Sequence, residues 1–151
     1  MIKKCIGGVE NKTFYVCGPD IMYRFCCGEM ERLDIPRRRV RREVAGPPQR
    51  VTQDPGWPQD IAEGRIFRVS VAGRDIPARA GDPLIISLER AGLVIPSACR
   101  SGECSLCRTK LLSGSVFHPA AVRLRKSDRR FGYIHPCLAY PLSDLNLLIW
   151  P

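Results

Sequence analysis

Four cysteines in the second half of the chain constrain its fold more than any other feature. Three of them, Cys99, Cys104 and Cys107, stand in the stretch SACRSGECSLCRT, with four and two residues between them. The fourth, Cys137, follows after 29 further residues, in YIHPCLAYP. Thiols can form disulfides, bind zinc or bind an iron–sulfur cluster, and each of these uses requires a different geometry of the chain.

The composition of the chain argues against disulfides. The 151 residues include eight cysteines, but no apolar run of a secretion signal follows Lys3 and Lys4. No segment approaches the roughly 18 consecutive apolar residues of a membrane helix. We therefore expect a soluble, cytoplasmic protein without membrane insertion, in which cysteines more often bind metal or carry out redox chemistry. Structural zinc binding remains an alternative, although zinc sites usually pair two short C-x2-C knuckles.

The spacing of the cysteines matches the plant-type ligand pattern of a [2Fe–2S] cluster. Two irons and two bridging sulfides need four thiolates, of which a wrapped loop can provide three and a distant strand end the fourth. Ser101, Gly102 and Ser105 lie among the ligand positions. Because these residues are small, backbone N–H groups can approach the sulfides and stabilise the negative charge that reduction adds.

The stretches PSACRSGECSLCRTKLLSG and HPCLAYPLSDL resemble a plant-type ferredoxin domain, and the likeness runs from about Ile66 to Ile149. The resemblance implies a β-grasp fold, in which a helix crosses a mixed sheet. It also implies one-electron transfer through a [2Fe–2S] cluster, with these metal ligands: Cys99, Cys104, Cys107 and Cys137. Photosynthetic ferredoxins are strongly acidic, whereas residues 64–151 carry 13 Lys and Arg against 6 Asp and Glu. We therefore expect the electron acceptor to be an acidic protein.

Residues 1–44 form a separate pattern of strand, helix and strand. The strand TFYVC precedes a helix from Asp20 to Leu33, and RRVRREV forms the second strand. This unit, with its Cys-Gly-Pro-x-x-Met motif, resembles the end of the NAD(P)-binding domain in the ferredoxin–NADP reductase family. The resemblance implies cofactor-binding roles beside the nicotinamide for Cys17, Gly18 and Pro19.

A reductase module followed by a ferredoxin domain is the order in phthalate dioxygenase reductase-type proteins. The resemblance implies that electrons pass from NAD(P)H through FAD or FMN to the cluster, and then to an acceptor such as a terminal oxygenase. No G-x-G-x-x-G run occurs in the chain, and the flavin barrel has no counterpart. We therefore expect a flavoprotein reductase module in cis or in trans, and no complete enzyme in this chain alone. The alternative is a small iron–sulfur relay subunit of a larger anaerobic flavoprotein complex.

The expected fold class is α+β, in three regions: 1–44, 45–63 and 64–151. Residues 45–63 contain four prolines and are expected to form a semi-rigid linker, with Trp57 held against a domain surface. In the third region, RIFRVSVAG and RDIPARAG predict a hairpin, and DPLIISLERAG predicts a helix with Asp82 at its N-cap. RTKLLSGSVF predicts one strand, SDRRFG a helical turn and DLNLLIW a final strand.

Two basic runs, PRRRVRREV and RLRKSDRR, raise the question of nucleic-acid binding. They contain few aromatic residues that could stack on bases, so we expect no nucleic-acid partner. His135 lies two residues before Cys137; because the four-cysteine set is complete without it, we expect a structural or exposed histidine. The guanidinium groups of Arg100 and Arg108 are expected to raise the reduction potential.

Overall fold

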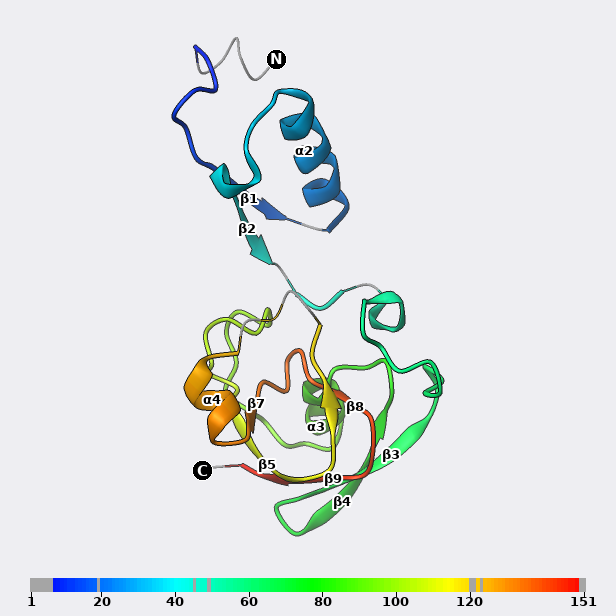
Figure 1. Cartoon of the computed structure of the whole chain (residues 1–151). Helices are drawn as coiled ribbons and strands as arrows, with labels where there is room; N and C mark the ends of the chain where they lie inside the picture. The colour runs from blue at the N-terminus through cyan, green and yellow to red at the C-terminus, as the bar shows by residue number, and fades with distance from the viewer. Residues whose placement is uncertain are drawn as a thin grey trace. The chain divides into compact units, whose positions relative to one another are not determined.

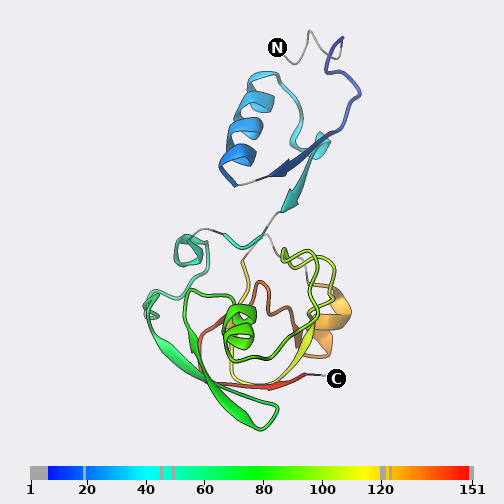
Figure 2. The same ribbon diagram turned by 180° about the vertical axis from the view of Figure 1, so that it is seen from behind.

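The computed structural model describes residues 7–18, 20–44, 46–48, 50–119, 122 and 124–149. The chain divides into two compact units, Met1–Ala45 and Gly46–Pro151. Figure 1 and, from behind, Figure 2 show the ribbon of both units.

The first unit is a β–α–β unit with a small core. Strand β1 (Phe14–Gly18) pairs in parallel with β2 (Val40–Val44), and helix α2 (Asp20–Arg32) and the short 3-10 helix η1 (Arg37–Arg39) connect them. The predicted strand–helix–strand order is therefore present. The buried apolar residues of this unit are Val9, Val16, Met30 and Ile35.

The second unit contains a mixed five-stranded sheet in the order β4-β3-β9-β5-β7. Strands β3 and β9 are parallel, and the other neighbours are antiparallel. The strands of this sheet are β3 (Ile66–Val71), β4 (Arg74–Arg79), β5 (Thr109–Ser113), β7 (Tyr133–Ile134) and β9 (Leu145–Leu148). A second, two-stranded sheet pairs β6 (Val116–Phe117) with β8 (Tyr140–Pro141). The helices are η2 (Val51–Gln53), α3 (Leu84–Arg90) and α4 (Lys126–Arg130). This α+β arrangement confirms the predicted fold class.

The β3–β4 hairpin follows directly from its sequence. Buried and exposed side chains alternate along both strands, so that one face of the hairpin enters the core. Ala72 and Gly73 form the two-residue turn, with φ angles of 49° and 70°. Two consecutive positive φ angles are typical of the type I′ turn, whose twist suits a hairpin. Pro77 lies in the edge strand β4, where a missing N–H group is tolerated.

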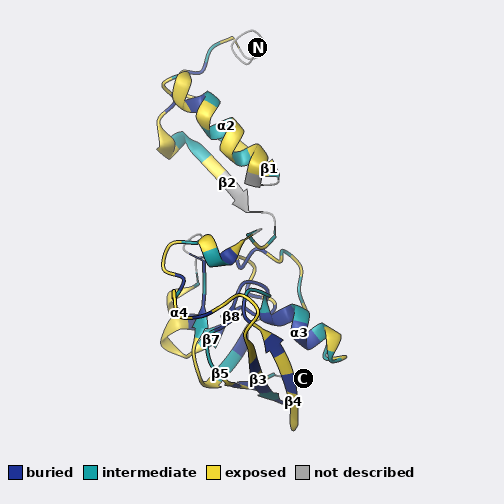
Figure 3. Ribbon diagram, turned by 90° about the vertical axis from the view of Figure 1, so that its right-hand side faces the viewer, coloured by how far each residue is buried: buried dark blue, intermediate teal, exposed yellow. Residues whose placement is uncertain are grey.

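Helix α3 packs across the sheet and closes the main core. Its buried face is dark blue in Figure 3, and it consists of Leu84, Ile85 and Leu88 together with Ser87. Leucine and isoleucine side chains of this kind stabilise the folded state by about 1.5–3 kcal/mol each when they are fully buried. Two of the four predicted ligands, Cys107 and Cys137, belong to the same core. One side of the candidate site is therefore built into the hydrophobic core.

The start of α3 differs from the prediction. Pro83, not Asp82, occupies the N-cap position, and no side chain caps the helix. The Asp82 carboxylate instead accepts a hydrogen bond of 3.2 Å from Arg90 Nη1. The predicted N-cap role of Asp82 is wrong, because this ion pair takes its side chain away from the helix end.

The segment predicted as one strand, RTKLLSGSVF, forms two strands. Strand β5 ends at Ser113, and Gly114 follows with a φ of 93°. A Cβ atom at Gly114 would lie 2.2 Å from the backbone oxygen of Asp144, so only glycine allows this close approach. After this turn, β6 leaves the main sheet and pairs with β8.

Part of the proline-rich segment packs into the second unit. Val51, Trp57 and Ile61 are buried in a second hydrophobic cluster with Phe117 and Tyr140. The Trp57 ring lies edge-on to the Phe117 ring, with 5.3 Å between centroids, and its Nε1 donates to the oxygen of Ile61 at 3.1 Å. This packing differs from the semi-rigid linker that the four prolines predicted. Trp57 holds the segment against the rest of the second unit, which agrees with the role predicted for it.

No helix in the described part of the chain combines the length and the apolar character that crossing a membrane requires.

Candidate metal centre

The loop between α3 and β5 carries three of the four cysteines, and its backbone shape explains its residue types. Arg100, Gly102 and Ser105 have positive φ angles of 49°, 78° and 58°. Such left-handed residues turn successive N–H groups toward one side, which creates a concavity that favours negative charge. A Cβ atom at Gly102 would lie 2.9 Å from Cγ1 of Val122, so the loop also needs glycine here for space.

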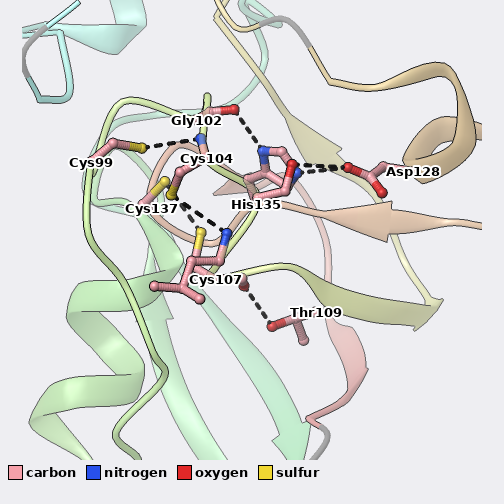
Figure 4. Close-up of polar contacts among 10 residues, drawn as sticks. Cys99, Gly102, Cys104, Cys107, Thr109, Asp128, His135 and Cys137 are labelled. Atoms are coloured by element: carbon pink, nitrogen blue, oxygen red, sulfur yellow. Dashed lines mark hydrogen bonds and ion pairs between the residues drawn. The ribbon is translucent and has the colours of Figure 1, made fainter.

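Backbone N–H groups of this loop point at cysteine sulfurs. The amides of Ser101 and Cys104 both donate to Cys99 Sγ at 3.4 Å, and the amide of Leu106 donates to Cys104 Sγ at 3.5 Å. Figure 4 shows the Cys104 amide directed at the sulfur of Cys99. These contacts are of the kind that the small residues among the cysteines predict. They favour the thiolate form, because an N–H donor stabilises negative charge on sulfur.

Cys107 and Cys137 form a second, buried pair. Their Sγ atoms lie 3.4 Å apart, which is a contact distance and not a disulfide bond. Both residues are 2 % exposed, whereas Cys104 is exposed to solvent. The candidate centre thus has a buried side, formed by the second pair, and an open side at Cys104.

The thiol pKa values differ between the cysteines. Burial raises the pKa of Cys99, but hydrogen bonds from Ser101 and Cys104 outweigh this effect and lower it to about 6. The hydrogen bond with the Cys137 side chain lowers the pKa of Cys107 to about 6 despite burial. The same contact, together with burial, raises the pKa of Cys137 well above its usual range. The contact therefore favours the thiolate form at Cys107 and the thiol form at Cys137.

The residues present fit a [2Fe–2S] cluster. The cysteines lie in two neighbouring pairs, because the Cys104 amide contacts Cys99 Sγ and the sulfurs of Cys107 and Cys137 lie 3.4 Å apart. A cluster of two irons held by four cysteines takes two thiolates per iron. Donors already directed at sulfur would also stabilise the charge of such a cluster. Among the residues that the structure describes, no three or more His, Cys, Asp or Glu side chains converge on a single ion position.

His135 is fully buried, which decides between its two predicted roles in favour of the structural one. Its Nδ1 lies 2.8 Å from the oxygen of Gly102, and its Nε2 lies 3.0 Å from Asp128 Oδ2. Asp128 is a residue of this site that was not predicted from the sequence. The available signal was that Asp128 is the one acidic residue between Cys104 and Ser143, a stretch with seven Lys and Arg.

The two arginines near the cysteines differ in whether a carboxylate offsets their charge. Arg100 Nη2 donates to Glu89 Oε1 at 2.5 Å, so a carboxylate offsets the charge of this guanidinium. The guanidinium of Arg108 lies 5.5 Å from the centre of the Tyr133 ring. Of the two, only Arg108 has no carboxylate partner among the residues that the structure describes.

The predicted nucleotide-site residues lie at the end of β1. Cys17 is exposed there, and Gly18 follows with a φ of 153°. A Cβ atom at Gly18 would lie 2.0 Å from Cε of Met22, so the glycine and the methionine of the motif pack against each other. Pro19 lies outside the described residues.

A comparison with protein-family models identifies the second unit. The model of the 2Fe-2S iron-sulfur cluster binding domain matches residues 67–142, which are 76 of the 151 residues. The chain belongs to this family. Membership confirms the predictions of a plant-type ferredoxin domain and of a [2Fe–2S] cofactor.

Curated relatives extend the likeness over different parts of the chain. The reductase subunit of aromatic O-demethylase from Amycolatopsis sp. is 36% identical over 83 residues, which cover 54% of this chain and 25% of the relative. The reductase subunit of stachydrine N-demethylase from Rhizobium meliloti is 28% identical over 145 residues, or 91% of this chain and 39% of the relative. The 2Fe–2S protein described here thus spans a quarter to two fifths of these relatives.

A solved structure shares the fold of both units. Phthalate dioxygenase reductase, a modular structure for electron transfer from pyridine nucleotides to [2Fe–2S], matches 97% of this chain with a TM-score of 0.55 and 22% identity. The match covers 43% of that structure. The predicted likeness to phthalate dioxygenase reductase-type proteins is confirmed at the level of the fold.

Proposed function

We propose that Cys99, Cys104, Cys107 and Cys137 ligate a [2Fe–2S] cluster that passes single electrons from a flavoprotein reductase module to an acceptor protein. The observation that supports this ligand set most strongly is the pairing of the thiols. One pair is joined by the Cys104 amide and the Cys99 sulfur, and the other by the 3.4 Å contact between Cys107 and Cys137. The cluster, when bound, supplies a centre that takes up and releases one electron.

The residues around the centre have separate roles in this proposal. The amides of Ser101, Cys104 and Leu106 donate to sulfur and stabilise the extra negative charge of the reduced form. The buried pair, Cys107 and Cys137, excludes water from one side of the centre. The exposed Cys104 offers the open side, at which a partner protein can approach the centre.

The proposed electron donor is a flavoprotein module that carries FAD or FMN and oxidises NAD(P)H, in cis or in trans. In this proposal residues 1–44 are the tail of its nucleotide domain and 64–151 the ferredoxin domain, and residues 45–63 join the two as a linker that is partly packed on the ferredoxin domain through Val51, Trp57 and Ile61. Tyr15, Ile21 and Phe25 of the first unit are 75%, 75% and 68% exposed, and such apolar residues favour a covering surface. Cys17, Gly18 and Pro19 remain the proposed nucleotide-site residues, and the exposed thiol of Cys17 near the end of β1 supports that role.

The proposed acceptor is an acidic protein, for example a terminal oxygenase. The surface near the cysteine loop supports this through its charge, because Asp128 is buried and bonded to His135. The exposed basic residues that flank the loop, here called the basic face, are Arg108, Arg125, Lys126, Arg129 and Arg130. The five cations outnumber the one exposed carboxylate of the loop, that of Glu103, and a predominantly basic face accelerates encounters with a partner of opposite charge.

Metal analysis and spectroscopy of anaerobically purified full-length chain test the proposal. We expect about two irons and two acid-labile sulfides per chain, and a rhombic EPR signal after reduction with dithionite. Single Cys→Ser variants at the four ligand positions should lose the signal, whereas Cys26→Ser, in helix α2, should keep it. Zinc without sulfide would reject the proposal, and so would a ligand variant that retains the wild-type spectrum.

A further inference from the structure

A buried histidine and carboxylate lie against the cysteine loop. His135 is 0% exposed and Asp128 is 2% exposed. The histidine ring contacts the Gly102 oxygen through Nδ1, at 2.8 Å, and Asp128 Oδ2 through Nε2, at 3.0 Å. Because a carbonyl oxygen can only accept, Nδ1 carries the hydrogen of the first bond. A ring held at both nitrogens cannot rotate without losing a buried hydrogen bond, which is unfavourable because the buried groups have no water to replace it.

Asp128 contacts the loop at a second point. Ser105 Oγ donates to Asp128 Oδ2 at 3.4 Å, and Ser105 is itself buried. Gly102 lies between the first and second cysteines of the loop, and Ser105 lies between the second and third. The pair of His135 and Asp128 therefore holds both inter-cysteine segments, as Figure 4 shows for the Gly102 side.

The direction of the Gly102 carbonyl affects the directions in which the neighbouring backbone N–H groups point. All described peptide bonds are trans, and in a trans peptide the C=O and the following N–H point in opposite directions. Holding the Gly102 oxygen at His135 therefore directs the amide of Glu103 away from the histidine. The amide of Cys104, in the next peptide, and that of Ser101, two peptides earlier, donate to Cys99 Sγ. Glycine restricts backbone rotation less than any other residue, so without the bond to His135 the Gly102 peptide can rotate and shift these donors.

We propose that His135, oriented by Asp128, is a positioning residue of the cysteine loop: it holds the Gly102 carbonyl so that the loop amides stay directed at the cysteine sulfurs. This inference rests on the proposed function, in which those sulfurs bind a [2Fe–2S] cluster. Loss of the His135–Gly102 bond weakens the N–H contacts to sulfur. The reduced form, which carries more negative charge, then loses more stabilisation than the oxidised form, and the reduction potential falls.

Two variants of the full chain replace the imidazole of His135 with a side-chain amide, and they test its two hydrogen bonds separately. The side-chain nitrogen of His135→Asn can take the place of Nδ1 and keep the donor to Gly102. The side-chain nitrogen of His135→Gln can take the place of Nε2, which keeps the contact with Asp128 and loses the one with Gly102. Both variants are neutral and polar, so a general effect of losing the imidazole ring acts on both.

An EPR-monitored redox titration of the loaded protein is the first measurement. At the wild-type midpoint potential, we expect His135→Gln to shift the ratio of reduced to oxidised cluster about tenfold toward the oxidised form. We expect His135→Asn to shift it by less than about threefold, because the Gly102 bond is kept. Equal shifts in both variants, a larger shift in His135→Asn, or wild-type potentials in both would overturn the proposal.

Hydrogen exchange of the metal-free full chain is the second measurement, and it does not depend on the cluster. We expect the amides of Ser101 and Cys104 to exchange about tenfold faster in His135→Gln than in His135→Asn, with unchanged exchange of the α3 amides as the internal control. Equal loop exchange in the two variants would overturn the positioning role even if either variant bound no cluster. Wild-type chain without iron and sulfide would reject the proposed function but would leave this test of the loop valid.

Discussion

The Sγ atoms of Cys107 and Cys137 lie 3.4 Å apart, although 29 residues separate them in the chain. The pairing of β5 with β7 explains this closeness, because Thr109 lies opposite Ile134 in the antiparallel register. Cys107 precedes Thr109 by two residues, and Cys137 follows Ile134 by three, so both thiols emerge at the same end of the strand pair. The geometry of the buried thiol pair therefore depends on a short β-ladder and not on the loop alone.

Replacement of Gly102 by alanine tests the packing of the cysteine loop. The new Cβ would lie 2.9 Å from Cγ1 of Val122 and 3.3 Å from Cδ1 of Leu138. We expect Gly102→Ala to lower stability by about 2–4 kcal/mol in thermal unfolding, from left-handed strain and overpacking together, and to reduce the iron content. Gly92→Ala is the matched control, because Gly92 has a φ of 76° and no atom within 4 Å of its Cβ position. That variant should lose only about 1–2 kcal/mol; equal losses in the two variants would contradict the packing argument.

The reactivity of Cys99 should depend on pH in the metal-free chain. Hydrogen bonds from Ser101 and Cys104 outweigh burial and lower the pKa of Cys99 from 9.0 to about 6. Because the thiolate is the reactive form, we expect alkylation of Cys99 by iodoacetamide to rise around pH 6 in the folded chain and around pH 9 in denaturant. Peptide mass spectrometry after a short pulse measures this site separately. Coincident pH profiles in the folded and denatured chains would show that the loop amides do not stabilise the thiolate.

His118 should make the stability of the protein sensitive to mild acid. Burial, with the nearby positive charges of His135 and Arg129, lowers the pKa of His118 from 6.5 to about 4. As pH falls, the unfolded chain therefore takes up this proton first. As far as this group is concerned, the free energy of unfolding is highest above pH 6.5 and falls as pH decreases to about 4. The decrease that His118 causes is at most about 3 kcal/mol.

A His118→Gln variant isolates the contribution of that histidine. Other groups titrate in the same pH range, so the difference in unfolding free energy between wild type and variant is the informative quantity. We expect the wild type to lose about 1–3 kcal/mol more than the variant between pH 7 and pH 4.5, measured by denaturant titration. Parallel pH profiles of the two proteins would mean that His118 does not couple protonation to unfolding.

Trp57 should stabilise the ferredoxin domain although it lies in the proline-rich segment. It is 5% exposed, and its ring contacts Phe117 and Tyr140 edge-on at centroid distances of 5.3 and 6.3 Å. We expect Trp57→Ala to lower the unfolding free energy by about 3–5 kcal/mol, because it leaves a cavity in the second hydrophobic cluster. Trp57→Phe, which keeps an aromatic ring, should lose less than half as much. A Trp57→Ala protein with wild-type stability would show that the segment behaves as a free spacer.

Charge reversal on the basic face should slow electron transfer to anionic oxidants. Ferricyanide, a trivalent anion, serves as the probe in stopped-flow oxidation of the reduced protein. We expect Lys126→Glu with Arg129→Glu to lower the rate about tenfold at low ionic strength, and salt to reduce this difference. The control is Arg74→Glu with Arg79→Glu, on the opposite edge strand β4, which changes net charge equally. Equal rates in the two double variants would mean that net charge matters and the basic face does not.

Much of the fold follows from local patterns in the sequence. Alternation in IFRVSV and RDIPAR, with Ala72-Gly73 between them, predicts the hairpin because strand pairing and turn geometry are both short-range. The helical spacing that begins at Asp20 predicts α2 for the same reason. The prediction was wrong where a distant residue decides the outcome. Asp144, 30 residues away, crowds Gly114 and breaks the expected strand, and Arg90 draws Asp82 away from the helix start.

The candidate site likewise has some features that the sequence predicts and others that only the tertiary structure decides. By itself the sequence determined the cofactor class and the proposed ligand residues, because the order and spacing of thiols within one loop are properties of consecutive residues. Only the tertiary structure decided which groups surround those thiols. The β5–β7 pairing brings Cys137 to Cys107, and the folding of α4 against the loop buries Asp128 beside His135 and Ser105. The residues that these contacts bring to the loop lie more than 20 positions from their loop partners, so the contacts depend on how the sheet and its connections pack and not on any local pattern.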